Sequence, residues 1–187
     1  PTPGAAGVVF VHGFFCNRAF WHPWLQRLAR DGRVYAAVSL EPVFGSIDAY
    51  AATVDAAVRR VHAATGVPVL LVCHSMGGLA VRAWLRDRDA DARVAHVVTL
   101  GSPHHGTWLA RFSFVPNARQ MRTDSRWLAQ LRRDEPPQRA AIDLAGRSQR
   151  QGRQRDDPAR ALVRRQTGAR ARVDRRGVEA RARDHRQ

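Results

Sequence analysis

The sequence predicts an α/β fold, with a mostly parallel sheet, helices on both of its faces, and an irregular C-terminal tail. Short continuous apolar runs alternate with segments whose apolar residues recur about every 3.6 positions, and this alternation is typical of such sheets. Residues 1–138 hold 16 Arg against 10 acidic residues, whereas residues 139–187 hold 15 Arg against 6 and contain no aromatic residue. We therefore expect one core domain over 1–138 and an Arg-rich, disordered tail over 139–187, because the tail has too few large apolar residues to form a core.

The predicted elements follow one another in a regular order. Strand-like apolar runs cover 8–11, 34–40, 67–73 and 94–100, and helical periodicity covers 20–28, 47–61 and 76–85. Gly32 and Gly66 end the first two helical segments, because glycine readily adopts the left-handed conformation that closes a helix. Ligand sites in such sheets lie at the carboxyl ends of the strands. The polar motifs that directly follow the strands are therefore the candidates for a functional site.

Residues 107–135 are less regular, and we interpret them as a cap segment over this edge of the sheet. Their apolar side chains fall into an irregular patch and one face of a short helix that Asp124 or Ser125 could cap. The patch contains Trp108, Leu109, Phe112, Phe114 and Val115, and the helix face contains Trp127, Leu128 and Leu131.

The composition excludes several classes of protein. With 187 residues, of which 44% are hydrophobic, the chain can hold one domain with a core. No run reaches the roughly 18 to 20 apolar residues that span a bilayer, and no signal peptide is recognisable. The chain begins without Met, which leaves an upstream segment open, and the cytoplasm is the default expectation for its location. Cys16 and Cys73 are too few for a disulfide framework and are expected to be free thiols.

A serine stands where a strand-like run gives way to a helical one. The run Val-Cys-His-Ser-Met-Gly-Gly at 72–78 places Ser75 between small residues, Cys73 two positions before it and Gly77 two positions after it. A nucleophile on such a sharp strand-to-helix turn is held in a strained conformation with its oxygen exposed. The usual pattern is Gly-x-Ser-x-Gly, and Cys73 replaces the first glycine.

The end of the first strand supplies a second motif. His12, Gly13 and Phe14 follow the run at 8–11, and the glycine lets the chain turn back over the site. The backbone N–H groups of Phe14 and Met76 are then expected to form an oxyanion hole, in which one donor contributes about 3 kcal/mol to stabilising the transition state.

The third motif, Gly-Ser-Pro-His-His-Gly-Thr at 101–107, follows the fourth strand-like run. Adjacent histidines on a turn point in different directions, and no cysteine or carboxylate cluster lies nearby in the sequence. We therefore expect no metal site, and we assign His104 and His105 to shaping the loop beneath the cap segment.

Together these motifs resemble those of bacterial lipases and esterases of the α/β-hydrolase superfamily, over about residues 6–135. The resemblance implies an α/β-hydrolase core, here incomplete, with Ser75 as nucleophile and Phe14 and Met76 as oxyanion donors. It also implies hydrolysis of a small-molecule or lipid carboxylic ester through an acyl-enzyme, without a metal or other cofactor. Haloperoxidases and thioesterases share the serine motif, so the resemblance specifies the superfamily more than the substrate. The supporting motif residues are His12, Gly13, His74 and Gly77.

Enzymes of this kind also need an acid and a histidine after the serine, since a serine hydroxyl requires an oriented general base. The only histidine after His105 is His185, within the tail. Asp156 and Asp157 precede it, but neither follows a strand-like run. The sequence therefore does not supply a clear acid and base, and the chain could be inactive.

A shift of reading frame after about Pro137 is an alternative hypothesis for the tail. A GC-rich gene read out of frame yields an excess of Arg, Ala, Gly and Gln and loses its aromatic residues, as the tail does. The run Arg-Gln-Arg at 153–155 can be encoded by CGA-CAA-CGT, which one base later reads Asp-Asn-Val. Resequencing the gene tests this hypothesis, which an intact frame without an Asp-containing strand in another frame would contradict.

The leading functional interpretation is a serine hydrolase that cleaves esters of apolar acyl chains. The side chains expected to line the approach to the site are Phe14, Phe15, Trp108, Phe112 and Phe114. One alternative is a non-catalytic hydrolase-like scaffold. The other, a binder of nucleic acid or of acidic surfaces, rests on the net charge of +15, but that charge is concentrated in a tail without aromatic residues for base stacking, so we expect no specific nucleic-acid partner. The oligomeric state stays open.

Overall fold

The computed structural model describes residues 4–87, 91–134 and 142–143. Its centre is a sheet with the strand order β2-β1-β3-β4-β5, in which every neighbouring pair of strands is parallel. The strands are β1 (Val8–Val11), β2 (Tyr35–Val38), β3 (Val69–His74), β4 (Val94–Leu100) and β5 (Ile142–Asp143). In this register Val11 of β1 lies beside Cys73 of β3, which in turn lies beside Thr99 of β4. The predicted parallel sheet is confirmed.

Helices connect the strands in the predicted alternation. Their bounds are η1 (Arg18–Trp21), α1 (His22–Arg30), η2 (Ile47–Tyr50), α2 (Ala51–Thr65), α3 (Met76–Asp87) and η3 (Asp91–Arg93), followed by η4 (Trp108–Phe112), α4 (Pro116–Gln120) and α5 (Arg126–Asp134). Gly66 has a φ of +70° and ends α2, as its position in the sequence predicts. Ser125 accepts a hydrogen bond from the Leu128 amide at 3.2 Å, so Ser125 rather than Asp124 caps α5.

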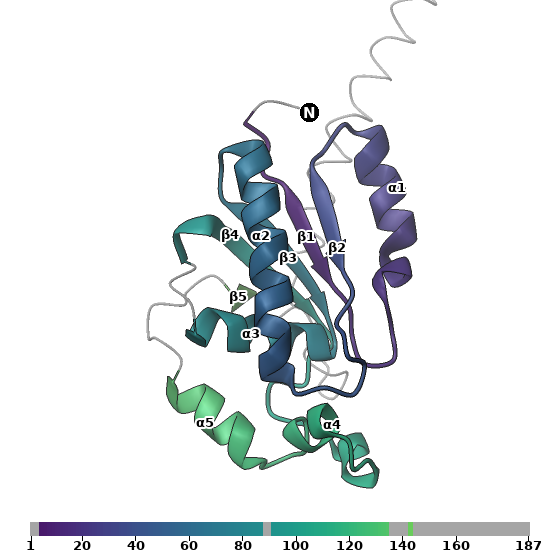
Figure 1. The fold of residues 1–187 in the computed structure, drawn as a ribbon, viewed down its shortest axis with the longest axis vertical. Helices are drawn as coiled ribbons and strands as arrows, with labels where there is room; N and C mark the ends of the chain where they lie inside the picture. Colours follow the sequence, from purple (N-terminus) through teal and green to yellow (C-terminus); the bar gives the residue numbers. More distant parts are fainter. Residues whose placement is uncertain (1–3, 88–90, 135–141, 144–187) are drawn as a thin grey trace, which may run out of the picture. The chain divides into compact units, whose positions relative to one another are not determined.

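The helices cover both faces of the sheet. Because successive strand residues point to opposite faces, Val9 and Val11 belong to one apolar cluster while Val8 and Phe10 belong to another. The first cluster is the larger one and contains the buried sides of α2 and α3, and the partly buried Leu25 and Leu28 of α1 pack against the second. Figure 1 shows α2 crossing the sheet on one side of it.

The sheet continues past the boundary that the composition predicts. Ile142 and Asp143 pair with Val97 and Val98 of β4, so a fifth strand lies within the range assigned to the tail. Composition does not reveal a strand that adds to a sheet edge through its backbone groups. Apart from 142–143, the tail assigned to 139–187, with its expected disorder or frame shift, lies outside the residues that the structure describes. Within those residues no helix is long and apolar enough to cross a membrane.

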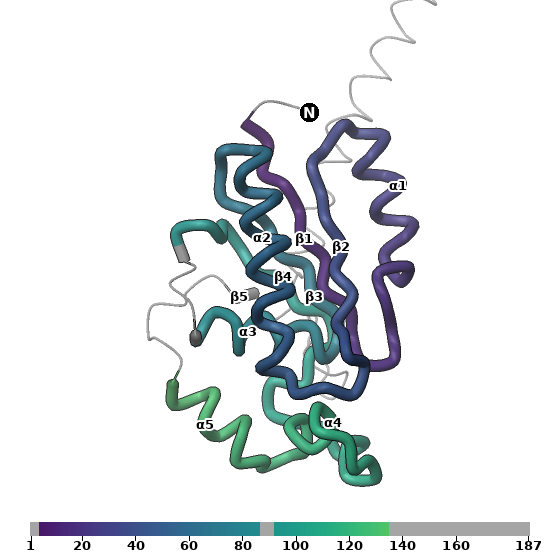
Figure 2. The backbone as a smooth tube through the Cα atoms, in the orientation of Figure 1, coloured from purple at the N-terminus to yellow at the C-terminus, as the bar shows by residue number. Residues whose placement is uncertain are grey.

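The carboxyl ends of the strands face the segment that we interpreted as a cap. The chain leaves β4, forms η4, and then forms α4 and α5, which lie beyond this edge of the sheet (Figure 2). Contacts of α4 with η2 and of α5 with α3 join the cap segment to the core. This edge is therefore where the three sequence motifs and the cap segment meet.

The buried Asp55 carboxylate of α2 links this helix to α3. Asp55 is 8% exposed and accepts hydrogen bonds from Trp84 Nε1 at 3.0 Å, Arg59 Nε at 2.7 Å and Arg93 Nη2 at 3.2 Å. Burial by itself raises the pKa of the Asp55 carboxyl, but the bonds from Trp84 and Arg59 and the charges of Arg59 and Arg93 outweigh burial and leave the pKa lowered.

Replacing Asp55 with Ala is expected to lower the free energy of unfolding by about 2–4 kcal/mol, because buried donors lose their acceptor. A lowered pKa in the folded state means that the ionic part of this stabilisation is complete above the ordinary value of 3.8 and is lost as the pH falls through the folded value. Denaturant titrations at neutral and acidic pH measure both effects. Asp31→Ala, at an exposed carboxylate, is the control, and an equal loss in the two variants would contradict the assignment.

Candidate active site

Ser75 occupies the single residue between β3 and α3. Its φ is +50°, a left-handed conformation that is uncommon for any residue other than glycine. The Ser75 amide donates to the carbonyl of Leu100 at the end of β4, with an N···O distance of 2.9 Å, and the side chain is half-buried. The strained strand-to-helix turn predicted for this serine is therefore present, and Ser75 is not a mid-helix residue.

Two glycines allow the backbone to approach this turn closely. A Cβ atom on Gly13 would lie 2.8 Å from Ser75 Cβ and 2.9 Å from His74 Nδ1, so the bend after β1 packs directly against the serine. A Cβ atom on Gly77 would lie 2.5 Å from the carbonyl oxygen of Val11 and 2.7 Å from that of His12. Both separations are too short for a side chain. The sequence prediction that the first and second motifs meet thus agrees with the backbone geometry.

The two backbone amides expected to form the oxyanion hole belong to Phe14 and Met76. Each directly follows one of the two residues in close contact, Gly13 and Ser75. Met76 is the first residue of α3, where a helix leaves its N–H groups without internal acceptors. Phe14 is in a turn closed by the Cys16 amide bonding the Gly13 carbonyl at 3.3 Å, with Phe15 at a φ of +56°. Within the described residues, neither the Phe14 nor the Met76 amide has a hydrogen-bond acceptor. Their role as oxyanion donors stays a prediction.

His12 has a supporting role in the backbone of this edge. It is 2% exposed, and its Nε2 accepts a hydrogen bond from the Leu40 amide at 2.9 Å. That acceptor role assigns the ring hydrogen of a neutral imidazole to Nδ1, which lies 2.8 Å from the Gly13 carbonyl oxygen. His12 therefore ties the end of β1 to the segment that follows β2, and it holds the Gly13 bend in place.

The two residues before Ser75 point to opposite sides of the sheet. Cys73 is fully buried in the larger apolar cluster, and burial raises the pKa of its thiol far above the usual range. The His74 ring stacks on Phe20 of η1 with centroids 4.5 Å apart. Burial of the ring, the larger cause, and its electrostatic interaction with the nearby His12 ring lower the pKa of His74 below its usual range. Both cysteines, Cys16 and Cys73, are free thiols.

The loop after β4 packs against α3. A Cβ atom on Gly78 would lie 2.8 Å from Ser102 Cβ, so the loop lies directly on the first turn of α3. His104 Nε2 is 3.1 Å from Thr99 Oγ1, and its Nδ1 is 3.2 Å from Arg82 Nη1. His105 is exposed. Among the residues with a described placement, no three His, Cys, Asp or Glu side chains are grouped as metal ligands would be.

The contacts described around Ser75 do not identify the general base or the acidic residue that the expected triad requires. The histidines after Ser75 in the described ranges are His96 on β4, His104 and His105. The contacts of His104 with Thr99 and Arg82 give it a structural role in the loop. His185, Asp156 and Asp157, the literal triad partners in the sequence, lie outside the described residues, as do 153–155.

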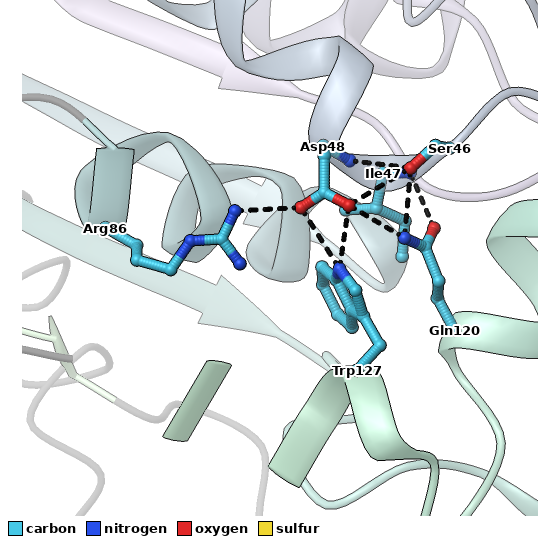
Figure 3. A network of polar contacts seen from close by, with 6 residues as sticks. All are labelled: Ser46, Ile47, Asp48, Arg86, Gln120 and Trp127. Atoms are coloured by element: carbon cyan, nitrogen blue, oxygen red, sulfur yellow. Dashed lines mark hydrogen bonds and ion pairs between the residues drawn. The ribbon is translucent and has the colours of Figure 1, made fainter. Parts of the chain in front are cut away.

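A polar network that the sequence did not reveal holds the cap segment on the core (Figure 3). Its centre is Asp48 of η2, which accepts from Trp127 Nε1 of α5 at 2.8 and 3.0 Å and from Gln120 Nε2 of α4 at 2.9 Å. Arg86 Nη2 of α3 donates to the same carboxylate at 3.0 Å. Gln120 Oε1 in turn accepts from the Ile47 amide at 2.7 Å. One carboxylate thus joins η2, α3, α4 and α5.

A second buried contact strengthens this attachment. Asn117 of α4 is fully buried, and its Nδ2 donates to the Val43 carbonyl at 2.8 Å and to Tyr50 Oη at 3.2 Å. Burial raises the pKa of Tyr50, whose hydroxyl donates to the Pro42 carbonyl at 2.7 Å. The cap segment is therefore bound at two places, each more than 60 residues away along the chain.

Replacing Asp48 with Ala is expected to loosen α4 and α5 and to lower the free energy of unfolding by about 1–3 kcal/mol, because Trp127 and Gln120 lose an acceptor. Amide hydrogen exchange should accelerate in 116–134 while β1 and β3 keep their protection. Asp48→Asn, which retains an acceptor oxygen, should show a smaller change. Unchanged exchange in α4 and α5 of Asp48→Ala would contradict the anchoring role.

Aromatic side chains lie in two groups around this edge. Phe14, Phe15 and Phe44 form one group, with ring centroids 4.3 to 6.1 Å apart. Trp108 and Phe112 of η4 form the other, with centroids 5.1 Å apart, and Phe114 follows them in the chain. The first group borders the Gly13 bend, and the second is carried by the cap segment.

Comparisons with known proteins agree with this fold. A sequence model of the alpha/beta hydrolase family matches residues 8–185. Mature lipase BlEst2 from Bacillus licheniformis is similar with a TM-score of 0.62 and 25% identity, over 71% of this chain and 60% of that one. This chain thus spans 60% of that lipase's length.

Two further solved structures show the same fold at lower identity. Phospholipase PlaB from Legionella pneumophila has a TM-score of 0.55 and 22% identity, over 70% of this chain and 35% of its own. Lipase B from Aspergillus fumigatus has a TM-score of 0.57 and 18% identity, over 69% and 34%. No curated protein sequence matches significantly. The family model covers most of the chain, and the protein therefore belongs to the alpha/beta hydrolase family.

Proposed function

We propose that this protein is a serine hydrolase that cleaves carboxylic esters through an acyl-enzyme on Ser75. The observation that carries the proposal is the conformation of Ser75, at a φ of +50° between β3 and α3 and in contact with the Gly13 bend. Strain of this kind persists only where the surrounding structure imposes it, and it is concentrated at functional sites. The likeness to lipase BlEst2 supports the same class of reaction.

The proposed chemistry follows from the groups around Ser75. The Ser75 hydroxyl oxygen attacks the ester carbonyl carbon, its proton passes to a general base and then to the leaving alcohol, and the carbonyl oxygen becomes an oxyanion. The amides of Phe14 and Met76 stabilise this oxyanion. Water then attacks the acyl-serine, releasing the carboxylic acid and restoring the hydroxyl.

The side of the site next to Phe14 favours an apolar acyl group. Phe14 carries one of the two proposed oxyanion donors, and its ring packs on Phe15 and Phe44, of which Phe15 is exposed. A carbonyl held by the Phe14 amide would therefore lie near the aromatic group of Phe14, Phe15 and Phe44. We infer that acyl chains of several carbons bind better than acetyl, since each buried methylene contributes about 0.8 kcal/mol.

A series of soluble p-nitrophenyl esters tests this proposal on the full chain. With acyl groups from acetyl to octanoyl, kcat/KM should rise several-fold before solubility limits the series. A burst of p-nitrophenol equal to the enzyme concentration would reveal the acyl-enzyme where deacylation is slow. Release indistinguishable from that given by heat-unfolded protein would contradict the proposal and favour the non-catalytic scaffold.

A further inference from the structure

Four large apolar side chains project from one short stretch of the cap segment into solvent. Trp108, Leu109, Phe112 and Phe114 are 59%, 73%, 66% and 85% exposed. We call these residues, together with Arg111, the cap tip. A concentration of exposed apolar surface on one loop marks an interaction site more often than scattered apolar residues do.

The cap tip is held in this exposed arrangement by hydrogen bonds at its base. The Arg122 guanidinium donates to the Ala110 carbonyl at 3.3 Å and to the Ser113 carbonyl at 2.9 Å, so it satisfies the backbone at the end of η4. At the start of η4 the Thr107 amide donates to the Met121 carbonyl at 2.8 Å. The side chains are therefore presented by an ordered support that α4 and α5 anchor to the core.

The charge of the cap tip indicates which surface it fits. The Arg111 guanidinium carbon lies 5.6 Å from the centroid of Trp108 and 5.3 Å from that of Phe112, so a cation stands among the exposed rings. The segment 107–134 contains six arginines and two aspartates. Rings that enter the acyl boundary beside a guanidinium that bonds phosphate are the arrangement by which peripheral proteins bind anionic lipid.

We propose that the cap tip docks onto the surface of an anionic phospholipid bilayer. Trp108, Phe112 and Phe114 enter the interface, and Arg111 bonds lipid phosphate. This inference goes beyond the proposed function, because docking requires no reaction at Ser75. A second copy of the chain fits the tip less well, because pairing would bring two segments with an excess of arginine together.

Binding is measured on the full chain carrying Ser75→Ala, so that no hydrolysis changes the vesicles. Cosedimentation with phosphatidylcholine vesicles, with and without phosphatidylglycerol, gives the partition coefficients. The double variant Phe112→Ser and Phe114→Ser should lose about tenfold or more in partitioning. Arg111→Gln should lose about fivefold on the anionic vesicles alone, the effect of about one cationic side chain at a membrane surface.

Matched control variants distinguish vesicle binding by the cap tip from nonspecific binding by other exposed aromatic or arginine side chains. Trp24 on α1 is 52% exposed, so Trp24→Ser removes a comparable aromatic from elsewhere. Arg119→Gln removes an exposed arginine of α4. Trp24→Ser should leave partitioning unchanged, and Arg119→Gln should reduce it less than Arg111→Gln does. These readouts are independent of the ester assay, so failure of docking and failure of the proposed function are distinguishable.

Three outcomes would overturn the proposal. If the cap-tip variants bind vesicles as well as their parent does, the binding is due to charge elsewhere in the chain, including the 15 arginines of 139–187. Equal binding to both kinds of vesicle would remove the role of anionic lipid. Self-association in sedimentation velocity that the tip variants abolish, without vesicle binding by the parent, would identify a second copy as the partner.

Discussion

Replacing Ser75 with Ala is expected to lower kcat/KM for every ester that the protein hydrolyses by about three orders of magnitude or more. The substitution removes the oxygen that would carry the acyl group and leaves the amides of Phe14 and Met76 in place. Substrate binding should therefore survive while turnover is lost. Steady-state hydrolysis of p-nitrophenyl butyrate, compared with the free energy of unfolding from denaturant titration, measures the two effects separately.

Ser102→Ala is the matched control for this variant. Ser102 lies on the loop after β4, against α3, and its buried Oγ has no hydrogen-bond partner among the described residues. Removing an unsatisfied buried hydroxyl is expected to change stability by less than about 1 kcal/mol and to leave turnover intact. Equal turnover by Ser75→Ala and the parent chain would contradict the role of Ser75.

Replacing Gly77 with Ala is expected to destabilise the fold by roughly 3 kcal/mol or more and to abolish turnover at the same time. The added Cβ would lie 2.5 Å from the Val11 carbonyl oxygen and 2.9 Å from its carbonyl carbon, and backbone atoms at the end of a central strand cannot yield cheaply. The first turn of α3 must then move away from β1. Such a shift would separate the Met76 amide from the Gly13 bend.

A different glycine separates this steric cost from the cost of an unfavourable backbone conformation. Gly66 has a φ of +70°, and a Cβ atom added there would meet open space, so Gly66→Ala introduces strain but no clash. It should lose about 1 kcal/mol of stability and keep normal turnover. Thermal unfolding and ester turnover of both variants provide the comparison. A Gly77→Ala protein as stable and active as Gly66→Ala would show that α3 does not need its close approach to β1.

The elements that the sequence predicted are those that periodicity and short motifs determine locally. The apolar runs gave β1 to β4, and Gly66 gave the end of α2, because burial and backbone conformation are encoded in adjacent residues. The helix that begins at Pro116 was not predicted, since its five residues are too few to show a period. Strand β5 was missed because its pairing with β4 uses backbone groups of a segment whose composition is typical of a tail.

In the candidate site, too, the features encoded by neighbouring residues were predicted and those formed by distant residues were not. The spacing around Ser75 predicted its turn, and the glycine after β1 predicted a close approach, which Gly13 makes. The anchoring by Asp48 could not be predicted, because its partners Gln120 and Trp127 lie 72 and 79 residues away and belong to no recognisable motif. The only local signal was Ser46, whose side chain caps η2 by accepting from the Asp48 amide.

Labelling with a fluorophosphonate probe, followed by mass mapping of the adduct, tests the role of Ser75 most directly. The probe phosphorylates a serine whose oxygen is activated and whose adduct is stabilised by oxyanion donors, so reaction reports the geometry without requiring deacylation. We expect one adduct, on the peptide that contains Ser75, formed by the folded chain and not by urea-unfolded protein or by Ser75→Ala. A folded chain that forms no adduct, or that carries it on a different serine, would contradict the proposed role of this strained turn.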